Sequence, residues 1–105
     1  MSDSICGMIG LAMRAGCVAA GTESAIAELQ KHRSRMILMD EDASENTRKR
    51  LQDKCSFYHA RLYVLPKGYL DRSLGKSGRM AAAVKTGNFD RQLMIMLDKD
   101  KNPAE

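Results

Sequence analysis

A short apolar run, Met36 to Met39, most constrains the fold, because four consecutive apolar residues are typical of a strand covered on both faces. The acidic turn Asp40–Asp42 follows it, and Ser44 can cap a helix. An apolar stripe at helical spacing runs along that helix: Thr47, Leu51, Cys55 and Tyr58. A second strand over 62–65 comes next and ends at Pro66. The order strand, helix, strand predicts a sheet with helices packed against it.

The same alternation continues on either side of this segment. Helical spacing predicts helices over 4–15, from Thr22 (as the cap) to near His32, over 69–74 and from Gly87-Asn88 onward. Short apolar runs predict two further strands, at 17–20 and 80–84. The fold class is therefore α/β, a three-layer α/β/α sandwich with four strands. One domain over 1–98 and a polar C-terminal tail over 99–105 are expected.

Composition limits the kinds of partner. The net charge of +4 permits a polyanion partner, whereas three Tyr, two Phe and no Trp argue against a base-stacking platform. The chain has neither a secretory signal nor a long apolar run, so we expect no membrane partner and a cytoplasmic location. Cys6, Cys17 and Cys55 are odd in number and are expected to be reduced.

Three motifs could suggest chemistry, and none has the spacing that the chemistry needs. Cys55 and His59 lie one helical turn apart but lack further ligands for a metal, so we place Cys55 in the core and His59 on the surface. Gly75-Lys76-Ser77 lacks the first Gly of a phosphate-binding P-loop, since Leu70 stands there. The turn Asp40–Asp42 lacks calcium-loop spacing. We therefore expect no catalytic residue, no metal, no cofactor and no enzymatic activity.

Two turns have features that suit a phosphate. The first turn contains Gly21, Thr22, Glu23 and Ser24, and its Gly leads into a helix whose first N–H groups can hold a phosphate. An ordinary helix cap is the alternative. The second is a basic loop between a helix and a strand: Lys76, Ser77, Gly78 and Arg79. The cluster Arg48–Arg50 fits either a solvated helix face or a nucleic-acid contact.

Several segments, taken in order, resemble one family. They are Ile9–Gly16, the turn at Gly21, Glu41–Thr47 with Lys49 and Asp53–Cys55, and Leu70 and Arg72 followed by Leu74–Lys76. The chain resembles the kink-turn-binding ribosomal protein family, of the L-seven-Ae and L-thirty-e type. Within it, the chain is most similar to the small bacterial YlxQ-like RNA-binding proteins.

The resemblance implies a mixed four-stranded sheet within the sandwich. It also implies that the turn at Gly21 docks onto a kinked RNA stem, and that the loop from Lys76 to Met80 packs against an extruded nucleotide. The partner would be structured RNA, with ribosomal RNA or the ribosome as candidates, bound by a monomer.

The sequence departs from the family pattern at the first turn. Members that bind kink-turns usually carry Gly-x-Asn-Glu and a Lys three residues later, and Glu23, Ser24 and Ala27 align with those positions. Asp71 stands where Gly is usual. A carboxylate only accepts hydrogen bonds and repels phosphates, so a second hypothesis remains: a protein-interaction module on the same fold that has lost kink-turn recognition.

Overall fold

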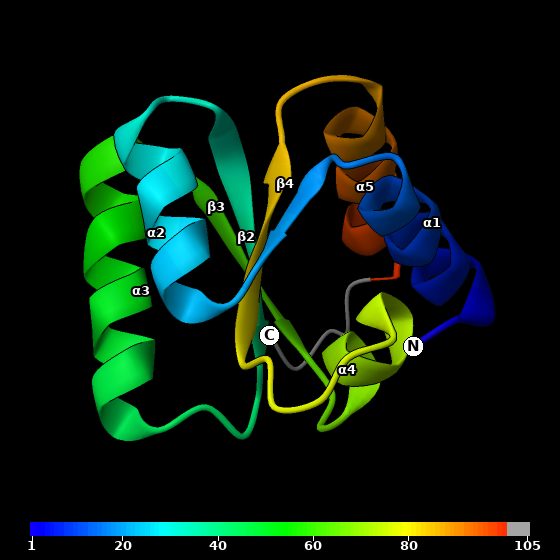
Figure 1. Ribbon diagram of the computed structural model, residues 1–105, viewed down its shortest axis with the longest axis horizontal. Coiled ribbons are helices and arrows are strands. Elements are labelled where there is room, and N and C mark those ends of the chain that lie inside the picture. The colour runs from blue at the N-terminus through cyan, green and yellow to red at the C-terminus, as the bar shows by residue number, and fades with distance from the viewer. Residues whose placement is uncertain (101–105) are drawn as a thin grey trace.

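Four short strands form one mixed sheet at the centre of the molecule, which is described for residues 1–100 by a computed structural model (Figure 1). The strands are β1 (Val18–Ala20), β2 (Ser34–Asp40), β3 (Arg61–Leu65) and β4 (Ala81–Lys85), in the order β1-β4-β2-β3. Strand β4 pairs antiparallel with β1 and β2, whereas β2 and β3 are parallel. The predicted mixed sheet of four strands is confirmed.

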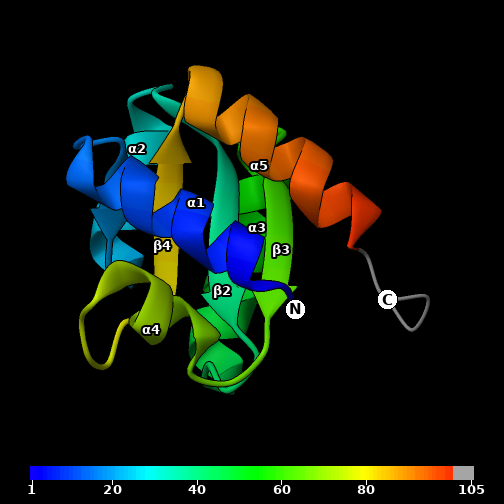
Figure 2. The ribbon, with the colours of Figure 1, turned by 90° about the vertical axis from the view of Figure 1, so that its right-hand side faces the viewer.

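Helices cover both faces of this sheet. Helices α2 (Thr22–Gln30) and α3 (Glu45–Tyr58) lie on one face. Helices α1 (Asp3–Arg14), α4 (Tyr69–Leu74) and α5 (Asn88–Lys99) cover the other, which faces the viewer in Figure 2. The predicted α/β/α sandwich is therefore confirmed. No helix within residues 1–100 is long and apolar enough to cross a bilayer.

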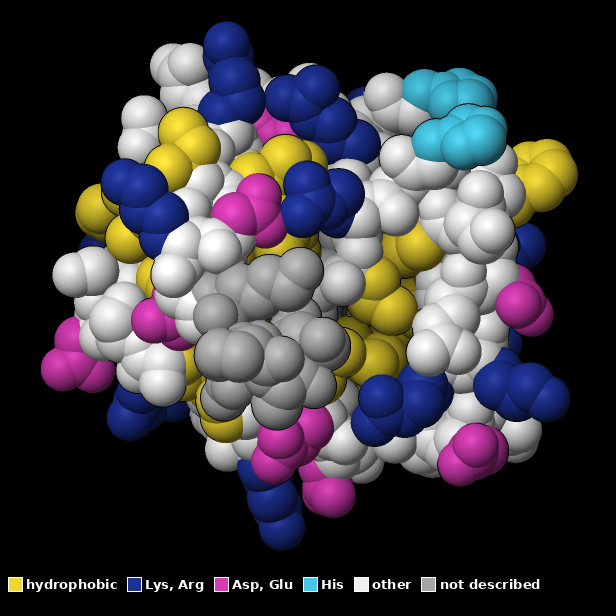
Figure 3. Space-filling view, turned by 180° about the vertical axis from the view of Figure 1, so that it is seen from behind, with side chains coloured by type: hydrophobic (Ala, Val, Ile, Leu, Met, Phe, Trp, Pro, Cys, Tyr) yellow, Lys and Arg dark blue, Asp and Glu magenta, His cyan; other side chains and the backbone are white. Residues whose placement is uncertain are grey.

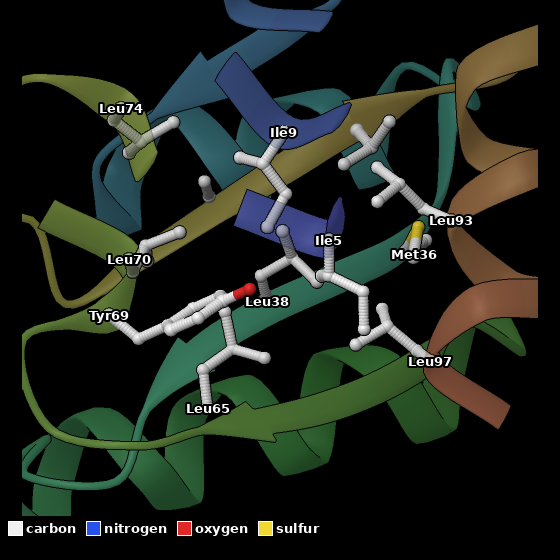
Figure 4. Close-up of a cluster of buried hydrophobic side chains, with 12 residues drawn as sticks. Ile5, Ile9, Met36, Leu38, Leu65, Tyr69, Leu70, Leu74, Leu93 and Leu97 are labelled. Carbon is white, nitrogen blue, oxygen red and sulfur yellow. The ribbon is translucent and has the colours of Figure 1, made fainter. Parts of the chain in front are cut away.

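Strand β2 supplies both halves of the core, because successive side chains of a strand point to opposite faces. Met36 and Leu38 pack with α1, α4 and α5 in the cluster that Figure 4 shows. Ile37 and Met39 pack with α2 and α3. All four side chains are fully buried, as the apolar run predicts.

Element boundaries differ from the predictions where polar groups decide them. Strand β2 begins at Ser34, since the Ser34 hydroxyl donates to the carbonyl of Val84 at 2.8 Å. The prediction that Thr22 caps α2 is wrong: Gly21 is the cap, at φ +108°, and Thr22 is the first helical residue. Helix α5 reaches Lys99, so the domain boundary predicted after residue 98 falls in its last turn, and residues 101–105 of the predicted tail lie outside the described residues.

Candidate nucleic-acid interface

Four loops meet at one edge of the sheet, at the bottom of Figure 1. The N–H of Gly21 donates to the carbonyl of Ala81 at 2.8 Å, and the N–H of Asp40 donates to the carbonyl of Met80 at 2.8 Å. The N–H of Gly68 donates to the Asp40 carboxylate at 2.9 Å. We call this the loop edge and define it by residues 20–24, 40–50, 65–72 and 75–80. The two predicted phosphate-friendly turns, 21–24 and 76–79, are thus neighbours in space.

The turn at Gly21 leaves the start of α2 open. Gly21 adopts a positive φ that strains any residue with a Cβ, and no side chain caps the helix. The first N–H groups of a helix have no partner within it, and the first intrahelical bond here is from the N–H of Ala25 to the carbonyl of Gly21. Thr22, Glu23 and Ser24 therefore present N–H donors at the positive end of the helix dipole, which suits an anion.

Glu23 is paired with an arginine from the neighbouring helix. Arg50 of α3 donates two hydrogen bonds to its carboxylate, at 2.6 and 3.2 Å. The hydrogen bonds from Arg50, with its charge, lower the pKa of the Glu23 carboxyl, which is therefore ionised at neutral pH. The Glu23 charge is thus paired with a guanidinium that has further N–H donors to offer, a partner that the expectation of simple repulsion did not include.

Asp71 organises the basic loop. Its side chain accepts from the N–H of Gly78 and from the N–H of Arg79, both at 2.8 Å. Its carbonyl accepts from the N–H groups of Gly75 and Lys76, at 2.9 and 3.1 Å. Four consecutive or near-consecutive backbone donors are thus held by one residue. The N–H groups of Gly78 and Arg79 are therefore already occupied, so the loop offers the Lys76 and Arg79 side chains to a partner rather than these two N–H groups.

Replacing Asp71 with Ala is expected to loosen this loop and to weaken RNA binding. The substitution removes two charged acceptors, so amide hydrogen exchange at Gly78 and Arg79 should rise. A loop that must be ordered on binding lowers affinity, by about fivefold if ordering costs about 1 kcal/mol. NMR-detected hydrogen exchange and an RNA titration measure both effects.

The matched control for this change is Asp53→Ala on the exposed face of α3, which removes the same charge and leaves the loop intact. Loss of a negative charge alone favours RNA, so affinities are compared with this control. Equal exchange rates and equal affinities in the two variants would show that Asp71 does not position the loop.

Cys55 and His59 lie in different environments. Cys55 is buried in the core, as predicted, and His59 is exposed at the end of α3 with a left-handed backbone. Among residues 1–100 no group of three His, Cys, Asp or Glu side chains is placed to hold a metal ion. The turn Asp40–Asp42 has a structural role: the Asp40 carboxylate accepts from the N–H of Asp42 at 2.7 Å.

Cys55 is expected to react slowly with iodoacetamide. Burial raises the pKa of the Cys55 thiol to about 11. The thiolate is the reactive form, so its population at pH 8 falls about a hundredfold for two pKa units. Mass spectrometry should find Cys6 and Cys17 labelled well before Cys55 in the folded protein, and all three labelled together in urea. Equal labelling in the folded protein would place Cys55 at the surface.

Sequence reasoning missed two roles at the loop edge. Arg50 was assigned to the basic cluster Arg48–Arg50, which fits either a solvated helix face or a nucleic-acid contact. Nothing local shows that it reaches Glu23, 27 residues away in the chain. Asp71 was considered only as a charge beside the RNA face. Asp often accepts from nearby backbone in turns, but no local pattern indicates a bond to Gly78, seven residues further on.

Comparison with known proteins shows the family. No family model matches the sequence. RNA-binding protein YlxQ of Bacillus subtilis (strain 168) is 38% identical over 92 residues, which are 87% of this chain and 92% of that protein. RNA-binding protein YlxQ of Enterococcus faecium is 35% identical over 81 residues, 76% of this chain and 79% of that protein.

Two solved structures share the fold. A protein of unknown function from Bacillus halodurans C has a TM-score of 0.83 and 30% identity, with 90% of this chain and 96% of that chain covered. The Giardia lamblia 15.5kD RNA binding protein has a TM-score of 0.73 over 90% of this chain and 82% of its own. At 13% identity this second likeness shows the fold alone, which is of the L-seven-Ae type. With the identity and coverage of the two curated relatives, the chain belongs to the YlxQ family.

Proposed function

We propose that this protein binds structured RNA at the loop edge and carries out no catalysis. The observation that carries the proposal is the bond between Gly21 and Ala81, which holds the open start of α2 beside the basic loop. The eight contact residues would be Gly21, Thr22, Glu23, Ser24, Lys76, Ser77, Gly78 and Arg79. The names of the two curated relatives, both RNA-binding proteins, support RNA as the partner.

A kinked stem fits this arrangement better than a straight duplex. The start of α2 offers backbone donors to phosphates, whereas the neighbouring loop offers long basic side chains. An RNA backbone that bends sharply and exposes a nucleotide can meet the backbone donors of α2 and the basic side chains of the loop at the same time. Proteins recognise RNA largely by such shape. We propose ribosomal RNA or another structured RNA as the target, a monomeric binder, and the cytoplasm as its location.

One observation favours the alternative, a protein-interaction module on the same fold. The loop edge carries seven Lys and Arg side chains against six carboxylates, so its net charge is only +1. A surface with so little excess positive charge gains less binding free energy from contacts with phosphates than a strongly basic surface does. Complementary shape and directed donors, rather than bulk charge, must therefore provide RNA affinity here.

A salt titration separates the two functions. Binding to RNA phosphates releases counterions. The affinity for a kink-turn RNA should therefore fall steeply between 50 and 200 mM salt, by about tenfold for every two phosphate contacts. An apolar protein contact has little such dependence. Absence of measurable binding to structured RNA at low salt would favour the protein-interaction module.

A further inference from the structure

The positive charge of this protein is concentrated away from the loop edge. The opposite edge, which we call the far edge, comprises residues 28–35, 59–61 and 85–91, at the top of Figure 1. It carries six Lys and Arg side chains and two carboxylates, a net charge of +4, against +1 for the loop edge. In Figure 3 Lys and Arg side chains predominate in the upper part of the molecule, with a few acidic side chains among them, whereas basic and acidic side chains are more evenly mixed in the lower part.

Backbone pairing brings the far-edge segments together. Ser34 of β2 pairs with Lys85 of β4. The N–H of Thr86 donates to the carbonyl of Arg33 at 2.9 Å, which holds the start of β2 beside the end of β4. Met36 of β2 pairs with Arg61 of β3, whose side chain is paired with Asp98 of α5 at 2.8 Å. The basic side chains of this edge are Lys31, Arg33, Arg35, Arg61, Lys85 and Arg91.

Two buried carboxylates hold two of these arginines in place. Glu28 is 7% exposed and accepts from Nε and Nη2 of Arg33, at 3.1 and 2.9 Å. Asp90 is fully buried and accepts from Nε of Arg35 at 2.8 Å and from the N–H of Gly87 at 2.9 Å. The Arg33 and Arg35 side chains remain 53% and 50% exposed. Each guanidinium is thus oriented by a buried carboxylate and keeps further N–H donors for solvent or a partner.

Two lysines act on the same carboxylate as Arg33. The hydrogen bond from Arg33 is the main cause that lowers the pKa of Glu28, against an opposing effect of burial, and the charges of Lys85 and Lys31 lower it further. Three cations, Arg33, Lys85 and Lys31, therefore act on one carboxylate that lies beneath the surface. Preoriented guanidiniums with adjacent ammonium groups match the oxygens of phosphodiesters, which accept bidentate bonds from Arg and point-charge contacts from Lys.

We propose that the far edge is a second RNA-binding surface, which holds the phosphodiester backbone of a duplex. It goes beyond the proposed function, because it assigns contacts outside the loop edge. The described molecule measures about 27 to 30 Å along its axes, and the two edges lie at opposite ends of the sheet. An RNA helix bound at one edge leaves the other edge free to bind a second RNA segment. The protein therefore bridges two RNA segments, one kinked at the loop edge and one regular at the far edge.

The test uses a short plain RNA duplex as the probe and the double change Lys31→Gln and Lys85→Gln. These substitutions leave both buried ion pairs intact, so the fold is retained. Two lost phosphate contacts should reduce the slope of log affinity against log salt by about 1.8 and weaken duplex binding about tenfold. The matched control, Lys54→Gln with Lys99→Gln, removes the same charge from α3 and α5 and should retain the slope.

Energy transfer between two labelled RNAs tests the bridge. The wild-type protein should bring a kink-turn RNA and the plain duplex together, and the Lys31/Lys85 variant should not, although it still prefers kinked over plain RNA. Equal binding of kinked and plain RNA by the wild-type protein would contradict the loop-edge function, whereas the effect of the Lys31/Lys85 variant on duplex binding would still test the far edge. Unchanged duplex binding and slope in the Lys31/Lys85 variant would overturn the far-edge proposal. Competition by poly-glutamate as strong as by RNA would overturn it too, in favour of an acidic protein partner.

Discussion

Replacing both Lys76 and Arg79 with Ala is expected to weaken binding to a kink-turn RNA by about ten- to a hundredfold. A hydrogen bond to a charged group is worth about 1.5–3 kcal/mol, and solvent screening reduces the two contacts together to about 1.4–2.8 kcal/mol. The salt dependence should become shallower by up to about two units, because two phosphate contacts are lost. Filter binding at several salt concentrations measures affinity and slope together.

The loop itself should survive this double change. Asp71 holds the loop through backbone N–H groups, which Ala retains, and the Arg79 side chain makes only a bond to the carbonyl of Ser77 at 3.1 Å within the loop. The control, Lys54→Gln with Lys99→Gln, lowers the net charge equally at a distance from the loop edge. Affinity and slope that match this control would remove the basic loop from the interface.

The double change Glu23→Asn and Ala27→Lys is expected to strengthen kink-turn binding about tenfold, equivalent to about 1.4 kcal/mol. Asn both donates and accepts at a base edge, whereas the carboxylate only accepts. Lys at position 27 lies one turn further along the same face of α2 and offers a phosphate a cation. The structure adds a third contribution, since loss of the Glu23 carboxylate releases Arg50 from its two hydrogen bonds.

Two comparisons separate these contributions. Adding Arg50→Gln to the double change should remove part of the gain if the released guanidinium contacts RNA. The gain should also be larger for kinked RNA than for a plain duplex of equal length, because added positive charge alone helps both. Equal gains on the two RNAs would mean that the start of α2 is only near the RNA, and no gain on either would favour the protein-interaction module.

The sequence predicts the layers of this protein well because local signals determine them. Met36–Met39 is apolar without interruption, so it predicts a strand buried on both faces, and all four residues are fully buried. Ser44 accepts from the N–H of Thr47 at 3.2 Å, as a capping residue should. Gly75 ends α4 with a left-handed backbone at the predicted residue. Each of these signals depends only on residues within one or two turns.

The candidate site is less predictable, because contacts between distant segments define it. Thr22 has the chemistry of a cap, yet the bond from Gly21 to Ala81 fixes the chain so that Gly21 takes that position instead. The pairing of Glu23 with Arg50 depends on how α2 and α3 dock on the sheet. The uneven charge of the two edges is likewise invisible until the strand order is known.

The most direct measurement is an NMR titration of the labelled protein with one equivalent of a kink-turn RNA. The account predicts that the amide signals of 21–24 and 76–79 shift or broaden first, that the N–H groups of Thr22, Glu23 and Ser24 become protected from hydrogen exchange, and that high salt reverses these changes. Signals of 21–24 and 76–79 that stay in place while the RNA binds would contradict the proposed interface.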